Sequence, residues 1–186
     1  ANLGVFYDET YDGDGLKIKE ILKKGPFAVK KTEVVPGCII EKIDGQAILK
    51  GQDYFPLLEG KSGKKVLLSI YNPVTGKRFP VTVKAISTGE QNQLLYKRWV
   101  DRNKEIVEKQ SGGRIAYVHV EGMDSPSFRT VYSELLSEKN RLKEAVIVDT
   151  RHNGGGWLHD DLATLLSGKE YQRFVPHGNY IGSDPF

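Results

Sequence analysis

The sequence contains little cysteine, no long apolar run and no strong excess of one charge. Its 186 residues include one cysteine, which excludes a disulfide within the chain and indicates no cysteine-rich metal site. Cys38 stands in an apolar run and is predicted to be a small core residue. No apolar segment reaches the about 18 residues that a membrane span needs, so no span is predicted.

The charged residues are nearly balanced in sign. Lysine and arginine number 27, aspartate and glutamate 24, and the net charge of +3 indicates neither a nucleic acid nor an anionic membrane as partner. A hydrophobic content of 39% is enough for a packed core. Residues 1–4 lack a signal-peptide pattern. The compartment stays open between export, if a signal peptide precedes Ala1, and the cytoplasm.

Residues 1–88 have the pattern of a β-rich unit. Apolar residues and turn signals predict strands at residues 3–7, 16–22, 65–71 and 78–86, and the last two flank a hairpin signal at 72–76. Between the second and third of these strands, the apolar residues Ile39, Ile40 and Ile43 end on an Asp-Gly turn. A short helix is expected from Asp53 to Gly60. Asp12 and Asp14 resemble the start of an EF-hand calcium loop. The glutamate that ends such a loop would fall at position 23, which is Lys23, so a hairpin turn is predicted instead.

Residues 89–112 have the pattern of a linking helix. Leu95, Trp99 and Ile106 follow helical spacing and predict one apolar side, while the charged side is interpreted as solvated. Glycines at 112 and 113 end the helix.

Residues 113–186 read as strand, helix, strand and helix. The strands are expected at 114–120 and 145–148, and the helix between them begins with Ser125 as N-cap and Pro126 in its first turn. Such a βαβ unit has parallel strands with a right-handed crossover. Ligands bind beyond the carboxyl ends of strands in sheets of this kind.

A glycine-rich corner follows the second of these strands. Residues 146–149 lead through Arg151 and Asn153 to three glycines at 154–156, and residues 157–166 have helical periodicity. Glycines allow positive φ, and the unpaired amides at a helix start favour a phosphate, a carboxylate or a developing oxyanion. A plain strand-to-helix connection without ligand is the alternative.

Two phosphate motifs can be tested by their spacing. A P-loop requires a lysine directly after its last glycine, but the first lysine after the corner is Lys169. A dinucleotide fingerprint requires a third glycine where His159 stands. Neither phosphate motif is present, which leaves an acyl oxyanion as the best remaining candidate for the bound anion.

Residues 113–120, a helix, and residues 147–156 ending in Asn-Gly-Gly-Gly resemble the core of the C-terminal-processing and tricorn-type serine peptidases. The helix containing Trp99 resembles the tricorn branch. Residues 35–46 resemble the circularly permuted PDZ domain of bacterial processing proteases, and residues 3–6 occupy the place of its carboxylate-binding loop. The resemblance implies a PDZ-like β-barrel or sandwich at 1–88, a linking helix at 89–112 and a partial βαβα peptidase core at 113–186.

The resemblance also implies roles for particular residues. In the peptidase core it implies an oxyanion-hole amide at Gly156, with Gly155 next in line. Structural support is expected from Asp149, Arg151 and Asn153, although a surface ion pair worth about 0–1 kcal/mol is the alternative for the charged pair.

In the PDZ-like unit, the resemblance implies that main-chain amides of Leu3, Gly4 and Val5 hold a peptide C-terminus. The peptide would add as a strand to the edge that begins at Val5. The alternative is a PDZ-shaped spacer that binds no peptide. Peptide or protein substrates are the expected partners, and no metal or cofactor is expected.

The nucleophile is expected to lie outside the chain. In the resembling family a serine begins a helix after a further parallel strand, and residues 171–182 contain no such pattern, so Ser183 is rejected. We expect a fragment of a serine endopeptidase that is inactive alone and that forms homo-oligomers in the parent protein. The alternative is a non-catalytic PDZ adaptor.

Overall fold

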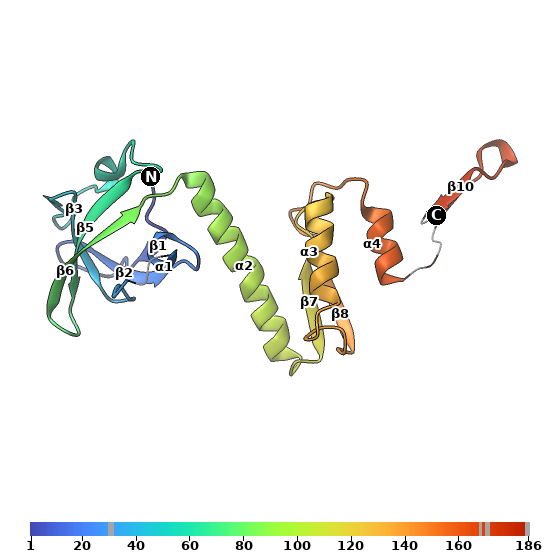
Figure 1. Cartoon of the computed structure of the whole chain (residues 1–186), viewed down its shortest axis with the longest axis horizontal. Coiled ribbons are helices and arrows are strands. Elements are labelled where there is room, and N and C mark those ends of the chain that lie inside the picture. The colour runs from blue at the N-terminus through green and yellow to red at the C-terminus, as the bar shows by residue number, and fades with distance from the viewer. Residues whose placement is uncertain (30–31, 168, 170–171, 185–186) are drawn as a thin grey trace. The chain divides into compact units, whose positions relative to one another are not determined.

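The computed structural model describes residues 1–29, 32–167, 169 and 172–184. Its contacts divide the chain into two compact units, Ala1–Trp99 and Val100–Phe186. Helix α2 (Thr88–Gln110) contributes residues to both units (Figure 1). No helix of the described residues is both long enough and apolar enough to cross a membrane.

The first unit is built around an antiparallel sheet, which has six strands among the described residues. Its strands are β1 (Val5–Tyr7), β2 (Leu16–Ile21), β3 (Ile39–Ile43), β4 (Gln46–Ala47), β5 (Lys65–Asn72) and β6 (Lys77–Lys84). The order is β1-β2-β3-β5-β6, and β4 pairs with β3. Strand β1 therefore lies at an edge of the sheet.

Alternating side chains of these strands form the core of the first unit. On β5, Val66, Leu68 and Ile70 are completely buried, whereas Leu67 between them is 47% exposed. Cys38 is buried in the same cluster, which confirms the prediction of a core residue.

The predicted hairpin around residues 72–76 is confirmed, because β5 and β6 pair along their whole length. Its turn is stabilised by Asn72, whose Oδ1 accepts hydrogen bonds from the amides of Val74 and Thr75 at 3.0 and 3.3 Å. Strands β1 and β2 also pair antiparallel, with a register shift between Phe6 and Tyr7.

Two short helices accompany the sheet, α1 (Pro26–Val29) and the 3-10 helix η1 (Phe55–Leu58). The helix expected from Asp53 to Gly60 is thus only four residues long and of the 3-10 type. Asp53 Oδ1 accepts the amide of Phe55 at 2.9 Å, but the N-cap is Tyr54, which makes no side-chain cap. The ring of Pro56 removes a backbone donor and restricts the helix to one turn.

The second unit contains a parallel pair of strands, β7 (Ile115–His119) and β8 (Ala145–Asp149), with α3 (Ser125–Leu135) between them in the chain. The predicted βαβ unit is therefore present. Helix α4 (His159–Leu166) follows β8. The chain continues through β9 (Gln172–Phe174), the 3-10 helix η2 (Pro176–Gly178) and β10 (Gly182–Asp184), and β9 pairs antiparallel with β10.

The N-cap of α3 is Asp124, and the prediction of Ser125 was wrong. Asp124 has extended φ and ψ, and its Oδ1 accepts the amide of Ser127 at 2.8 Å. An N-cap side chain must reach the amide two or three positions further on, and the carboxylate at 124 does so. This hydrogen bond holds the pKa of Asp124 below its usual value.

Helix α2 combines ion pairs with an apolar side on which Leu95 and Trp99 are half-buried. None of its residues is buried, and Ile106 is 48% exposed. In the first unit, Arg98 Nε donates to Glu20 at 2.5 Å. In the second unit, Lys104 Nζ donates to Glu134 at 2.6 Å. Two residues of the charged side thus form ion pairs, whereas Lys97 and Arg102 are exposed, as the prediction of a solvated side expects.

A small cluster of valines and leucines forms the core of the second unit. Helix α3 lies along the β7–β8 pair, as Figure 1 shows, and buries its Val131 there. The fully buried members on β7 and just beyond it are Val118 and Val120, and α4 contributes Leu162. This packing places the carboxyl ends of both strands next to the start of α4.

Candidate functional site

The glycine corner lies at the carboxyl end of β8, and Asn153 ties it to the neighbouring strand. Asn153 Nδ2 donates to the Val120 carbonyl at 2.9 Å, and its Oδ1 accepts the Gly155 amide at 2.7 Å. The glycines at 154–156 are exposed. One side chain therefore sets the position of the loop relative to the end of β7.

Asp149, the last residue of β8, is buried beneath this corner with 7% of its surface exposed. Its Oδ1 accepts the backbone amide of Arg151 at 3.0 Å, and the guanidinium of Arg151 contacts both carboxylate oxygens. The Asp149 carbonyl accepts the amide of Val120 at 2.9 Å. The pair thus joins side chain to main chain, which a surface ion pair does not do.

The Arg151 hydrogen bonds hold the pKa of Asp149 well below its usual value, against the opposing effect of burial. The same contact raises the pKa of Arg151. Both groups are therefore charged at neutral pH, and the carboxylate is fixed as an acceptor under the loop.

Tyr117 is a third member of this network that the sequence analysis missed. Its hydroxyl donates to Asp149 Oδ2 at 2.5 Å from the neighbouring strand β7. Burial raises the pKa of Tyr117, and the hydrogen bond to Asp149 raises it further. Parallel register places Tyr117 opposite Ile147, two residues before the carboxylate. The sequence signal for this contact was the alternation of side chains along β7. It puts Tyr117 on the same face as His119, and His119 pairs with Asp149 in the strand register.

Gly156 has surroundings that only a glycine fits. Its φ is +151°, and an added Cβ would lie 2.5 Å from the Cβ of Met123. Its carbonyl lies 3.2 Å from Nδ1 of His159. No described residue accepts a hydrogen bond from its amide. Of the two glycines expected to form an oxyanion hole, Gly155 already donates to Asn153, whereas Gly156 has an amide to offer.

Helix α4 begins at His159, two residues later than the sequence predicts. Its N-cap, Leu158, makes no side-chain cap, and Asp160 and Asp161 occupy the first turn. The amides of the helix start therefore lie near these carboxylates, beyond the glycines. Any anion site at the corner depends on loop amides. Trp157, between the glycines and the helix, is 91% exposed.

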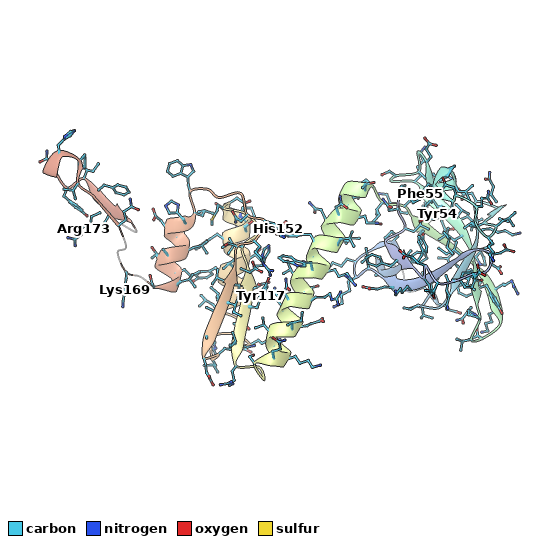
Figure 2. All side chains as sticks on the ribbon, turned by 180° about the vertical axis from the view of Figure 1, so that it is seen from behind. Tyr54, Phe55, Tyr117, His152, Lys169 and Arg173 are labelled. Atoms are coloured by element: carbon cyan, nitrogen blue, oxygen red, sulfur yellow. The ribbon has the colours of Figure 1, made fainter. Side chains whose placement is uncertain are left out.

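The histidines and Ser183 lie in different surroundings. His119 is buried, which lowers its pKa, and Figure 2 labels His152, an exposed residue of the corner with a φ of +66°. His177 lies in η2 with a φ of +51°. Ser183 lies in β10 opposite Arg173, a strand position and not a helix start. The rejection of Ser183 also relied on residues 171 and 185, which lie outside the residues that the structure describes.

The carboxylates of the 12–15 turn bind lysine. Asp12 pairs with Lys50 at 2.8 Å, and Asp14 Oδ1 accepts the Lys50 amide at 2.8 Å. In the described part of the chain, no three histidine, cysteine or acidic side chains gather as metal ligands would.

The residues predicted to bind a peptide, Leu3, Gly4 and Val5, lie at the beginning of the edge strand β1. Gly4 has a φ of +66°, and a Cβ there would lie 2.6 Å from Cδ of Pro26. The Gly4 carbonyl accepts the amide of Leu22 at 2.9 Å. Beside them lies a groove of about 630 Å³ between β1 and η1.

Comparisons with known proteins agree with this architecture. Residues 114–185 match the model of peptidase family S41. The chain is 39% identical over 166 residues to a putative tricorn-like protease C-terminal subunit of Sulfurisphaera tokodaii, covering 85% of this chain and 18% of that one. It is 29% identical over 157 residues to the tricorn protease of Thermoplasma volcanium, covering 84% and 14%.

Two further similarities extend the comparison. The tail-specific protease of Haemophilus influenzae is 29% identical over 167 residues, which is 84% of this chain and 22% of that protein. The crystal structure of the tricorn protease superimposes on 99% of this chain and 18% of its own with a TM-score of 0.71 at 20% identity, so the fold is shared. The chain spans less than a quarter of the length of these relatives.

The family is that of the C-terminal-processing and tricorn-type serine peptidases, and the chain belongs to it. Within this family, the similarities to several tricorn proteases and to the tricorn fold support the tricorn type.

Proposed function

We propose that the chain is part of a serine endopeptidase, in which the Gly156 amide stabilises the oxyanion of the tetrahedral intermediate. The observation that carries the proposal is an exposed glycine loop whose Gly156 amide has no described acceptor, held above a buried carboxylate. An amide aimed at developing negative charge is worth about 3 kcal/mol in the transition state of acyl transfer. Gly155 is secondary in this proposal, because its amide donates to Asn153.

Two side chains hold the proposed oxyanion site. Asp149 fixes the Arg151 amide, and Asn153 links the loop to the carbonyl that ends β7. These residues position main-chain groups and do not themselves touch the substrate in this proposal. The network makes the loop rigid before the reaction, which is what electrostatic stabilisation requires.

The first unit is proposed to be a PDZ-like module, residues 1–88, which binds peptide C-termini at Leu3, Gly4 and Val5. Support comes from the edge position of β1, which leaves one side of the strand open to an added strand, and from the groove beside it. Residues 89–112 would link it to the peptidase core at 113–186. The alternative is a non-catalytic adaptor that has the same groove and no peptidase activity.

The oxyanion proposal is tested by Gly156→Ala in the longest natural chain that contains residues 1–186, with peptide hydrolysis as the measurement. We expect kcat to fall about 100-fold. Gly154→Ala is the matched control, because a methyl group there meets no atom within 4 Å and φ is not positive. Equal kcat for both variants would contradict the proposal, and a wild-type chain without activity would favour the adaptor.

Because a methyl group at 156 also crowds Met123, a second measurement separates catalysis from folding. Peptide aldehydes form a tetrahedral adduct with serine peptidases, whereas a plain peptide of the same sequence does not. Gly156→Ala should lose aldehyde affinity and keep affinity for the plain peptide. Equal losses for both ligands would indicate a structural defect and count against the assigned role.

A further inference from the structure

The groove of the first unit has two unlike walls. Strand β1 and the following residues 8–13 form one wall, and residues 48–58, which include η1, form the other. The volume of about 630 Å³ is sufficient for several side chains of an extended peptide. An incoming strand that pairs with β1 would place every second side chain into this groove.

The middle of the groove is aromatic. Tyr7 of β1 meets Tyr54 edge to face with ring centres 5.3 Å apart, and Tyr54 stacks on Phe55 at 4.6 Å. Figure 2 labels Tyr54 and Phe55, which are neighbours in the first unit. Phe55 is 63% exposed, an unusual state for a large apolar ring. This part of the groove fits an apolar side chain of the bound peptide.

The far end of the groove is acidic. Asp8 pairs with Lys17 at 3.2 Å, and Asp12 pairs with Lys50 at 2.8 Å. The third carboxylate of the lining, Glu9, is exposed and makes no ion pair with any residue that the structure describes. Three carboxylates thus face two lysines, which leaves the negative charge of Glu9 uncompensated.

The direction of the peptide follows from the position of its carboxylate. A C-terminus held at Leu3–Val5 requires the added strand to run antiparallel to β1, so its earlier residues pass Tyr7 and then reach Asp8 and Glu9. One residue advances about 3.3 Å along β1, which ends at Tyr7, and Asp8 and Glu9 follow directly, with Glu9 in a turn. The residues about three to five positions before the C-terminus therefore meet the acidic end.

We propose that this groove selects peptide C-termini with an apolar side chain near the end and basic residues about three to five positions before it. The proposal rests on the peptide-binding function proposed above. Glu9 is its specificity-determining residue for the basic positions, and Phe55 is that for the apolar side chain. The whole chain has a net charge of +3, so non-specific attraction would favour acidic peptides, the opposite preference.

The test uses the 186-residue chain and three fluorescent peptides of one length, titrated at low salt. One has lysines at the upstream positions, one has glutamates there, and the third is the lysine peptide with an amidated C-terminus. We expect the lysine peptide to bind about three- to ten-fold more tightly than the glutamate peptide, and the difference to shrink in high salt. The amidated peptide should bind weakly.

Two pairs of variants assign the effect. Glu9→Lys should remove the preference for lysine, whereas Glu138→Lys, the same change of charge on the second unit, should leave it intact. Phe55→Ala should weaken both free peptides, whereas Val74→Ala, at a hairpin tip 91% exposed, should weaken neither. A preference that survives Glu9→Lys overturns the proposal.

The outcomes separate this inference from the function on which it rests. Carboxylate-dependent binding without any difference between lysine and glutamate overturns the inference and leaves the peptide-binding function standing. Equal binding of free and amidated peptides, or none by any peptide, overturns both, because the register along β1 then has no anchor.

Discussion

The two units hold the backbone of their proposed sites in different ways. In the first unit, an edge strand lies beside a groove, and the backbone of this strand is positioned by ordinary sheet pairing with β2. In the second unit, a loop is held by side chains, namely a buried carboxylate, a tyrosine and an asparagine. An edge strand accepts many sequences by its backbone, whereas a fixed loop presents one amide at one place.

The pockets of the two units show the same contrast. The groove beside β1 has aromatic walls and one uncompensated carboxylate. The second unit has a pocket of about 420 Å³ lined mainly by lysines and glutamates, and these neutralise one another through pairs such as Lys104–Glu134. The first cavity has the features of a binding site, and the second has those of a structural ion-pair network. Substitutions of the residues that line this second pocket should therefore act on stability.

The largest effect on this contrast is expected from Asp149→Ala. It leaves the Tyr117 hydroxyl and the Arg151 amide without their acceptor, which should lower the stability of the second unit by about 3 kcal/mol. Hydrogen exchange should accelerate in β7 and β8 and stay unchanged in β5 and β6. Equal acceleration in both sheets would show that the units do not differ as described.

Tyr117→Phe should have a smaller effect of the same kind. It removes one hydrogen bond to a charged group and keeps the ring, so a loss of about 1–2 kcal/mol is expected in the second unit. Tyr71→Phe on β5 is the matched control, since the described hydroxyl of Tyr71 has no hydrogen bond. Thermal unfolding of both variants measures the difference, and identical midpoints would remove Tyr117 from the network.

Acid should distinguish the units as well. The pKa of Asp149 is lowered on folding, so its contribution is complete above the unfolded value near 3.8 and is lost as pH falls below it. The second unit should therefore lose stability below about pH 4. Asp149→Asn should flatten this dependence in the second unit, as followed by hydrogen exchange in β7 and β8. An unchanged acid transition in that variant would assign the effect to other carboxylates.

The smallest effect concerns association of copies. Strand β8 pairs with β7 on one side, and Ile147 on it is 43% exposed. Such an edge can pair with another chain. Ile147→Lys should reduce self-association in sedimentation at high concentration, and Leu67→Lys on the interior strand β5 should not. A wild-type chain that stays monomeric at high concentration would contradict this expectation.

Local patterns predicted the elements whose causes are local. The hairpin turn at Asn72, the βαβ order and the core position of Cys38 follow from residues close in sequence. The bond between Tyr117 and Asp149 joins residues 32 positions apart and depends on the register of two strands. The close approach of Gly156 to Met123 likewise joins distant parts of the chain. The spacing of residues along the sequence predicts neither of these two contacts.

Asn153 uses both ends of its amide, one on the carbonyl that terminates β7 and one on the Gly155 amide. A displacement of that strand end would therefore turn the peptide plane that carries the Gly155 N–H, one residue before Gly156. The position of the loop therefore depends on the position of the neighbouring strand end. Any partner that displaces β7 would change the orientation of a single N–H in the loop.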